Sequence, residues 1–137
     1  MSTPFNDRDR RYLDALYDGS LRYTDRHVGR LFDFLQNKGM FEDSLIAVTA
    51  DHGEKLLETP GRFEHGGGWY DSVGRIPLII SYPKKLRKGR FDFFSESVDL
   101  FPTLLNLLRI AIPPDKALDG VNLIDMMDQK VPTKKAV

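Results

Sequence analysis

The chain has 137 residues with 20 basic and 20 acidic side chains, so its formal net charge is zero, and it has no cysteine. This length suffices for one domain that buries roughly two thirds of its unfolded surface. The charge balance gives no basic face for nucleic acid or an anionic membrane, and we interpret the basic run 84–90 as a solvated loop. The absence of cysteine excludes a disulfide framework, a thiolate metal site and a cysteine nucleophile. No apolar stretch is long enough to span a bilayer and residues 1–6 lack a signal-peptide pattern, so we expect no membrane partner and, by default, a cytoplasmic location.

The first element that the sequence predicts is one long helix from about Asp7 to Lys38. Its apolar residues recur at steps of three and four, which places them along one face of the helix. Asn6 or Asp7 is a suitable N-cap, and Lys38 with Gly39 marks the end. His27 lies on this helix, and we interpret it as packed or solvated rather than catalytic.

Two apolar segments, 45–49 and 76–82, predict strands, with a polar loop from 53 to about 69 between them. Both segments are apolar throughout instead of alternating, so the strands are expected to be buried on both faces. The predicted helices give only limited cover for such strands. The sequence therefore predicts an α/β layer in which helices cover a sheet, and this sheet is expected to be part of a larger one.

The last third of the chain predicts shorter elements. Phe91, Phe93 and Phe94 suggest a short strand. Asp99 is predicted to be the N-cap of an apolar helix that has Pro102 in its first turn. Beyond this helix the sequence predicts, in order, an irregular segment, a turn, a short helix or strand, and a frayed tail, at 110–119, 118–120, 123–127 and 131–137.

Polar residues follow the first predicted strand directly. Asp51 and His52 are suitable ligands for a metal ion, and Gly53 permits the turn from which two neighbouring side chains can reach the same ion. In open α/β sheets, ligands bind at the carboxyl ends of strands. The alternative is that Asp51 caps the next segment and His52 is an ordinary surface residue. The dipeptide by itself leaves both interpretations open.

Five segments of the chain, in order, resemble landmarks of the sulfatases, a family of the alkaline-phosphatase superfamily. The landmarks are a long helix, a strand ending in a metal-binding Asp-His-Gly or Asp-Asn-Gly, a histidine loop with its following strand, and two later segments. They lie at 17–31, 43–54, 64–80, 98–105 and 118–123. The resemblance implies that residues 1–130 are the C-terminal part of a sulfatase-type catalytic domain, with a partial alkaline-phosphatase-like sheet covered by helices. Residues 131–137 would then be a disordered tail.

The resemblance also implies roles for five residues. Asp51 and His52 would be two ligands of a divalent cation, with calcium favoured and manganese or zinc as alternatives. His65 would contact the sulfate or donate a proton to the leaving oxygen, and a loop histidine that binds water is the alternative. Lys55 and Arg75 are further candidates to face the sulfate.

Two parts of the site that the family uses are not found in this sequence. Sulfatases carry the motif Cys or Ser, any residue, Pro, any residue, Arg, whose first residue is oxidised to a formylglycine nucleophile. The nearest match begins at Ser81, has Lys85 in place of the arginine, and follows a late strand where the family has no nucleophile. The paired aspartates that complete the metal site also belong to an N-terminal part. We therefore expect the isolated chain to be inactive, and a sulfate ester to be its substrate only when such a part completes it.

Three other functions fit parts of the sequence. His65 and the glycines after it imitate the oxyanion loop of lipase-like serine hydrolases, but the Gly-x-Ser-x-Gly elbow and a later histidine are absent. A phosphoryl-transfer relative, of the phosphodiesterase, phosphonate hydrolase or phosphoglycerate mutase type, shares the Asp-His-Gly strand end, and its nucleophile would distinguish it. The third is a non-catalytic remnant or a segment that works only beside a partner.

Overall fold

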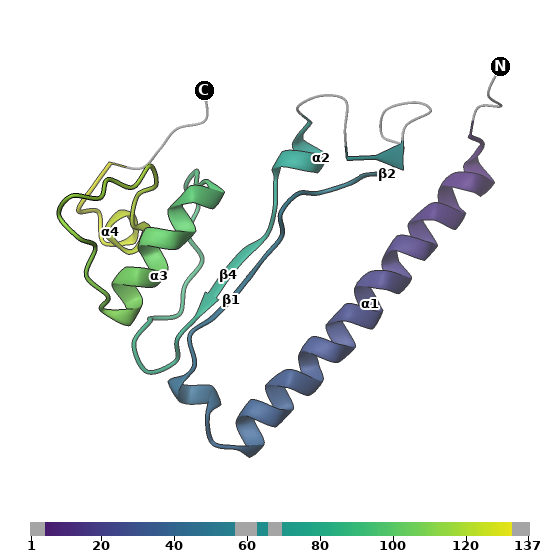
Figure 1. The fold of residues 1–137 in the computed structure, drawn as a ribbon. Helices are drawn as coiled ribbons and strands as arrows, with labels where there is room; N and C mark the ends of the chain where they lie inside the picture. The colour runs from purple at the N-terminus through teal and green to yellow at the C-terminus, as the bar shows by residue number, and fades with distance from the viewer. Residues whose placement is uncertain (1–4, 57–62, 66–69, 133–137) are drawn as a thin grey trace. The chain divides into compact units, whose positions relative to one another are not determined.

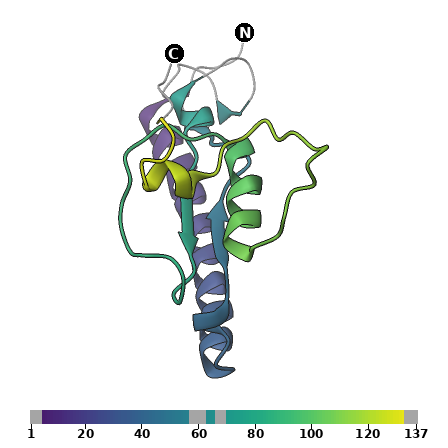
Figure 2. The same cartoon turned by 90° about the vertical axis from the view of Figure 1, so that its left-hand side faces the viewer.

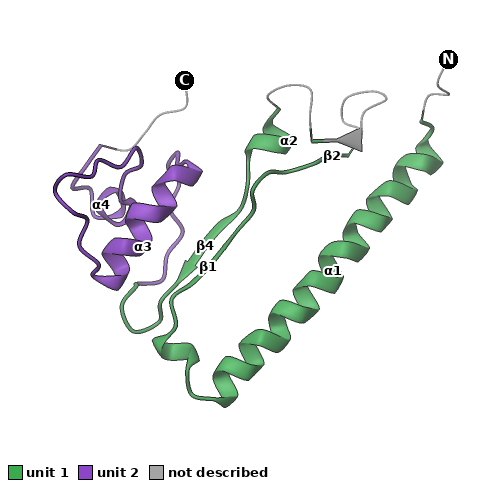
Figure 3. Ribbon diagram, viewed as in Figure 1, with its two compact units in different colours: residues 1–86 green, residues 87–137 purple. Residues whose placement is uncertain are grey.

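The computed structural model describes residues 5–56, 63–65 and 70–132 of the chain. They belong to two compact units, residues 1–86 and residues 87–137 (Figure 3). The described residues combine helices with small antiparallel sheets, which confirms the predicted mixture of helix and sheet. The candidate site residues named above all belong to the first unit.

The first unit begins with the helix α1, Asp7–Asn37. Asn6 is its N-cap: the Asn6 side chain accepts hydrogen bonds from the backbone N–H groups of Arg8 and Asp9, and the Asp9 carboxylate accepts from the N–H of Asn6. This reciprocal arrangement is a capping box. The predicted long helix is thus confirmed, with Asn6 rather than Asp7 as the cap. No described helix combines the length and the apolar character needed to cross a bilayer.

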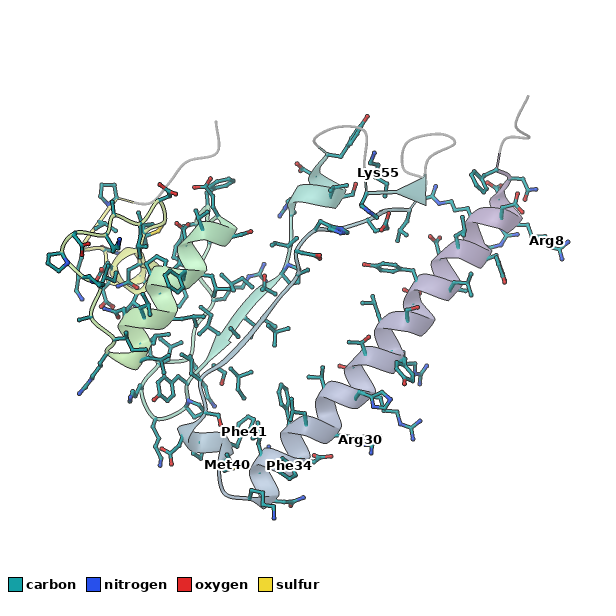
Figure 4. All side chains as sticks on the ribbon, viewed as in Figure 1. Arg8, Arg30, Phe34, Met40, Phe41 and Lys55 are labelled. Carbon is teal, nitrogen blue, oxygen red and sulfur yellow. The ribbon has the colours of Figure 1, made fainter. Side chains whose placement is uncertain are left out.

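The chain turns sharply where α1 ends. Gly39 has a φ of +67°, a conformation that glycine adopts without steric cost, and the short helix η1, Phe41–Asp43, follows. The rings of Phe32 and Phe41 meet edge to face, with 5.9 Å between centroids. Figure 4 shows Phe34 and Met40 at the same turn. These apolar contacts fix the direction in which the chain leaves the helix.

Strand β1, Ile46–Thr49, pairs in antiparallel fashion with strand β4, Leu78–Ser81. Figures 1 and 2 show the two strands side by side and running in opposite directions. Both predicted strands are confirmed, although each is shorter than its apolar segment. The expectation that they are buried on both faces is wrong for the described residues, because Val48 is 39% exposed and Ile79, its register partner, is 62% exposed. Within the described chain the ribbon has only these two strands, so little material covers it.

A second, smaller ribbon lies within the segment predicted to be a polar loop. Strand β2, Lys55–Leu56, pairs in antiparallel fashion with strand β3, Phe63–Glu64, and the one-turn helix α2, Asp71–Gly74, follows. The parts of the predicted loop at 57–62 and 66–69 lie outside the described residues. This ribbon matters for the site because it pairs residues on either side of the loop.

The second unit has its core between two helices, α3 at Leu100–Leu108 and α4 at Leu123–Met127. Leu107, Leu123 and Met126 are buried there. Pro102 lies in the first turn of α3, as predicted, and the alternative of a helix at 123–127 is the correct one. The tail predicted at 131–137 lies outside the described residues from 133 onward.

One prediction for the second unit is wrong, and another is right in position only. The phenylalanines at 91–94 form no strand; only an isolated bridge occurs there, at Phe94. Asp99 is at the N-cap position of α3, as predicted, but its carboxylate makes no capping hydrogen bond to that helix. It accepts hydrogen bonds instead from the N–H groups of Glu96, before the short helix η2 at Ser97–Asp99, and of Val121, which is far along the chain. The buried Asp99 therefore ties two distant backbone segments together.

Candidate functional site

The carboxylate of Asp51 stands at the end of β1, where the chain leaves the strand. Its Oδ1 accepts a hydrogen bond of 2.9 Å from the backbone N–H of His52, and its Oδ2 lies 3.7 Å from His52 Nε2. The N–H of His52 is the main cause that lowers the pKa of Asp51 below its ordinary value, followed by the N–H of Asp51 itself and the charge of the His52 ring. Asp51 is therefore a solvent-exposed anion throughout the neutral pH range.

The imidazole of His52 has a defined orientation. Its Nδ1 lies 2.9 Å from the carbonyl oxygen of Gly53. A carbonyl only accepts hydrogen bonds, so Nδ1 must carry the proton, and the lone pair of the neutral ring is then on Nε2. Nε2 is the atom that faces Asp51 Oδ2, which leaves one nitrogen and one oxygen donor at the end of the strand. A backbone carbonyl on the other ring nitrogen is how metal-binding histidines are commonly oriented.

These two donors fit part of the ligand set of a divalent cation. Among the residues that the structure describes, no three histidine, aspartate or glutamate side chains are arranged to hold a metal ion. A cation that prefers six or more oxygen ligands needs more donors than Asp51 and His52 supply. The pair is thus suited to one side of a metal site.

Gly53 lets helix α2 approach the end of β1 closely. The N–H of Gly53 donates a 2.8 Å hydrogen bond to the carbonyl of Val73. A Cβ atom at position 53 would collide with the carbonyl oxygen of Ser72, so no larger residue fits without displacement of the backbone. The sequence predicted that glycine permits a turn here; the structure adds that glycine is required by close contact with α2.

His65 reaches the same place by way of the β2–β3 ribbon. Lys55 is paired with Glu64 in this ribbon, and the next pair in the same antiparallel register is Glu54 with His65. The Nδ1 atom of His65 lies 3.2 Å from Glu54 Oε2. The His65 ring stacks on that of His52, with 4.4 Å between centroids and 24° between planes. The structure thus brings Asp51, His52 and His65 together.

The structure does not bring the two other candidates to these rings. The Lys55 side chain is fully buried, and its Nζ lies 4.5 Å from the centre of the Tyr70 ring (Figure 4 labels Lys55 on β2). Arg75 is exposed just after α2, and its guanidinium makes no ion pair with a described residue. Their roles toward a sulfate stay predictions.

Sequence reasoning missed two residues that shape the site, Glu54 and Tyr70. Glu54 follows the Asp-His-Gly tripeptide directly, but its partner is eleven residues away across a ribbon of two-residue strands. Strands of that length are too short to produce a readable alternation of polar and apolar residues. Tyr70 was missed for a similar reason, since no periodic pattern in the sequence connects it with Lys55, whose Nζ lies over its ring.

Comparison with known proteins gives the family of the chain. The sequence model of the sulfatase family matches residues 2–110, which is well over half of the chain. The chain belongs to the sulfatase family. It is 30% identical to the steryl-sulfatase of Mus musculus over 130 residues, covering 85% of this chain and 21% of that protein. It is 34% identical to the multifunctional alkaline phosphatase superfamily protein PehA of Trinickia caryophylli over 127 residues, covering 90% of this chain and 24% of that protein.

A solved structure extends the likeness to the fold. The phosphonate monoester hydrolase SpPMH of Silicibacter pomeroyi superimposes with a TM-score of 0.79 at 34% sequence identity. The match covers 93% of this chain and 24% of that hydrolase. The chain therefore spans between a fifth and a quarter of the length of these relatives, and it has the corresponding part of the SpPMH fold.

Proposed function

We propose that this chain is the C-terminal, metal-binding part of a sulfatase-type catalytic domain that hydrolyses sulfate esters. The observation that carries the proposal is the stack of His52 and His65 beside Asp51, at the carboxyl end of a strand in a chain of the sulfatase family. By itself the chain is expected to be inactive, since its sequence has no cysteine and no Ser-x-Pro-x-Arg motif.

Asp51 Oδ2 and His52 Nε2 would hold the divalent cation. When bound, the cation supplies neutralisation of the charge on the ester oxygens and orientation of the nucleophile. We propose calcium, with manganese or zinc as alternatives because an imidazole nitrogen also suits them. Isothermal titration of the chain should give weak binding, with a dissociation constant of about 1 mM or above for a two-donor site. Asp51→Ala should abolish it, whereas Asp33→Ala on the exposed surface of α1 should not.

His65 would act at the ester side of the site. Its ring is 60% exposed, and Nδ1 is occupied by Glu54, so Nε2 is the atom available to a substrate. As the bond between sulfur and the leaving oxygen breaks, the proton on Nε2 would pass to that oxygen, a contribution of roughly 10²–10⁴-fold in rate. Arg75 is exposed and would attract the anion, while Lys55 would have to leave the Tyr70 ring to do the same.

A second candidate is hydrolysis of a phosphonate or phosphate ester. It is favoured by the likeness to SpPMH, whose name is that of a phosphonate monoester hydrolase, and to PehA, a multifunctional protein of the alkaline phosphatase superfamily. Asp51, His52 and His65 would serve either reaction, because both neutralise an anionic ester and protonate a leaving oxygen. The residues in this chain therefore leave the choice between sulfur and phosphorus to the nucleophile.

A chimera tests the proposal and its competitors together. Residues 5–132 of this chain would replace the corresponding quarter of SpPMH, and the isolated chain would be assayed beside it with an aryl sulfate and an aryl phosphonate. We expect turnover by the chimera only, lost in Asp51→Ala and reduced in His65→Ala. A folded chimera without any turnover would support a non-catalytic remnant, and turnover by the isolated chain would contradict the need for an N-terminal part. The coding sequence upstream of Met1 is the complementary observation, since paired aspartates and a Cys/Ser-x-Pro-x-Arg motif in frame would identify that part.

A further inference from the structure

The side-chain contact between Glu54 and His65 lies directly beside the small ribbon. The register of β2 with β3 pairs Lys55 with Glu64 and Leu56 with Phe63. Glu54 and His65 are the residues next to the last pair of this ladder, and continuing the same register sets them opposite each other, where side chains are close enough to interact. Their 3.2 Å contact is the one that the register of the ribbon favours.

The side chains of Glu54 and His65 differ in how far they are exposed to solvent. The Glu54 side chain is 22% exposed and the His65 side chain 60% exposed. The carboxylate is the sheltered partner, while the imidazole extends toward solvent from it. A carboxylate that accepts from one ring nitrogen and leaves the other open is the usual means by which proteins orient a working histidine.

A second contact limits the His65 ring in another direction. The face of the ring lies on His52 at 4.4 Å, nearly parallel to it. The bond to Glu54 fixes one edge of the ring, and the stack fixes its plane. The bond to Glu54 and the stack on His52 together restrict rotation about the side-chain bonds of His65, so its Nε2 points in one direction.

We propose that Glu54 is a positioning residue for His65, which holds the proton on Nδ1 so that Nε2 is the nitrogen that faces the ester. An ionised carboxylate can only accept, so a neutral His65 bonded to it must be the Nδ1–H form. In that form Nε2 has the lone pair, and when the ring gains a second proton Nε2 carries it. In both forms the proton on Nδ1 of His65 stays hydrogen-bonded to Glu54. The proposal rests on the proposed function only for the use to which Nε2 is put.

Nitrogen-15 NMR of the imidazoles tests this contact on the intact chain. At about pH 8.5, where an ordinary histidine is neutral, the shifts of Nδ1 and Nε2 report which nitrogen carries the proton. We expect the Nδ1–H form of His65 to dominate in the wild type. Glu54→Ala should lower the ratio of Nδ1–H to Nε2–H by about ten-fold, the effect of losing one hydrogen bond to a charged group. Glu42→Ala, which removes an exposed glutamate from η1, is the matched control and should leave the ratio unchanged.

Two results would overturn the positioning role. One is a wild-type His65 that is mainly the Nε2–H form, which decides the matter even if Glu54→Ala does not fold. The other is a folded Glu54→Ala chain with an unchanged ratio. Titration of the wild type with sodium sulfate tests the proposed role of His65 toward the ester separately from the positioning role of Glu54. A ratio that depends on Glu54, together with a His65 Nε2 that does not respond to sulfate, would support the positioning contact and count against His65 as the residue facing the ester.

Discussion

The lowered pKa of the Asp51 carboxyl is caused mainly by a backbone group. The N–H of His52 is the largest cause of its lowered pKa, ahead of the charge of the His52 ring. His52→Asn keeps that N–H and removes the ring, so the pKa of Asp51 should rise in part but stay below its ordinary value of 3.8. Since the folded-state pKa is depressed, the carboxylate stays ionised as pH falls through 3.8 and is lost only below it. Carbon-13 NMR titration of the Asp51 carboxyl measures this directly, and a full return to the ordinary value would show that the ring charge dominates.

Gly53 allows a second test with single residues. Gly53→Ala places a methyl group against the Ser72 carbonyl oxygen, so we expect the free energy of unfolding to fall by about 1–3 kcal/mol, as for other overpacked positions. Gly74→Ala is the matched control in the same segment, because a Cβ there meets no atom within 4 Å. It should be neutral or slightly stabilising, through the reduced entropy of the unfolded chain. Urea unfolding monitored at Trp69 or Tyr70 measures both, and equal effects of the two substitutions would contradict the close contact.

The residues of the site differ in how readily they can be identified from the sequence. Asp51 and His52 are adjacent and follow an apolar strand, so the sequence alone marks them as candidate ligands, and the family resemblance favours the metal site over a surface turn. His65 is predicted only through the family resemblance, because nothing local indicates that it returns to the end of β1. Glu54 was missed because its contact is set by the register of a ribbon of two-residue strands, and register is a property of the folded backbone.

Among the elements, the link between α3 and the segment before α4 depends on two buried side chains. Asp99 accepts from the N–H of Val121, and the hydroxyl of Thr103 accepts from the N–H of Leu123 while donating to the carbonyl of Asp99. Asp99 and Thr103 are both fully buried, so water cannot replace either one when it is removed. The N–H groups of Val121 and Leu123 thus donate to side chains at the start of α3.

Asp99→Ala should therefore destabilise the second unit strongly. It leaves the part-buried N–H groups of Glu96 and Val121 without the buried carboxylate, and the loss of a hydrogen bond to a charged group costs about 1.5–3 kcal/mol. We expect the free energy of unfolding to fall by about 2–5 kcal/mol. Asp119→Ala, which removes an exposed carboxylate one residue before Gly120, should change it by about 0.5 kcal/mol or less. Calorimetric melting compares the two variants, and a small effect of Asp99→Ala would mean that the loop is held by other contacts.

The same residues explain where element prediction fails. Asp99 has the sequence features of an N-cap and occupies that position, but its carboxylate bonds to the N–H of Val121, 22 positions later, which the local sequence does not indicate. Phe91, Phe93 and Phe94 alternate as in a strand, but a strand also needs a partner, and the described structure gives them only an isolated bridge. Long periodic elements such as α1 are predicted well because their own residues determine them.

On the scale of the whole molecule, β1 and β4 are more exposed to solvent than strands of such apolar composition normally are. Val48 and Ile79 face each other across the β1–β4 ribbon and are both exposed, whereas strands of this composition are normally buried on both faces. The chain spans about a quarter of SpPMH, so the remainder of such a domain would be available to cover them. A two-stranded ribbon alone is marginally stable in water. Under the proposed function, the exposed ribbon is the surface on which the N-terminal part packs.

This assignment makes Ile79→Thr a discriminating substitution. In the isolated chain Ile79 is 62% exposed, so its replacement should change the free energy of unfolding by about 0.5 kcal/mol or less. In the SpPMH chimera the same residue would be buried, and loss of its apolar contacts should cost about 1–3 kcal/mol. Leu123→Ala, in the core of the second unit, is the contrasting variant and should cost about 2–5 kcal/mol in both proteins. Chemical unfolding of the four variants gives the comparison. An equally small effect of Ile79→Thr in the chain and in the folded chimera would mean that the ribbon stays exposed and that the N-terminal part packs elsewhere.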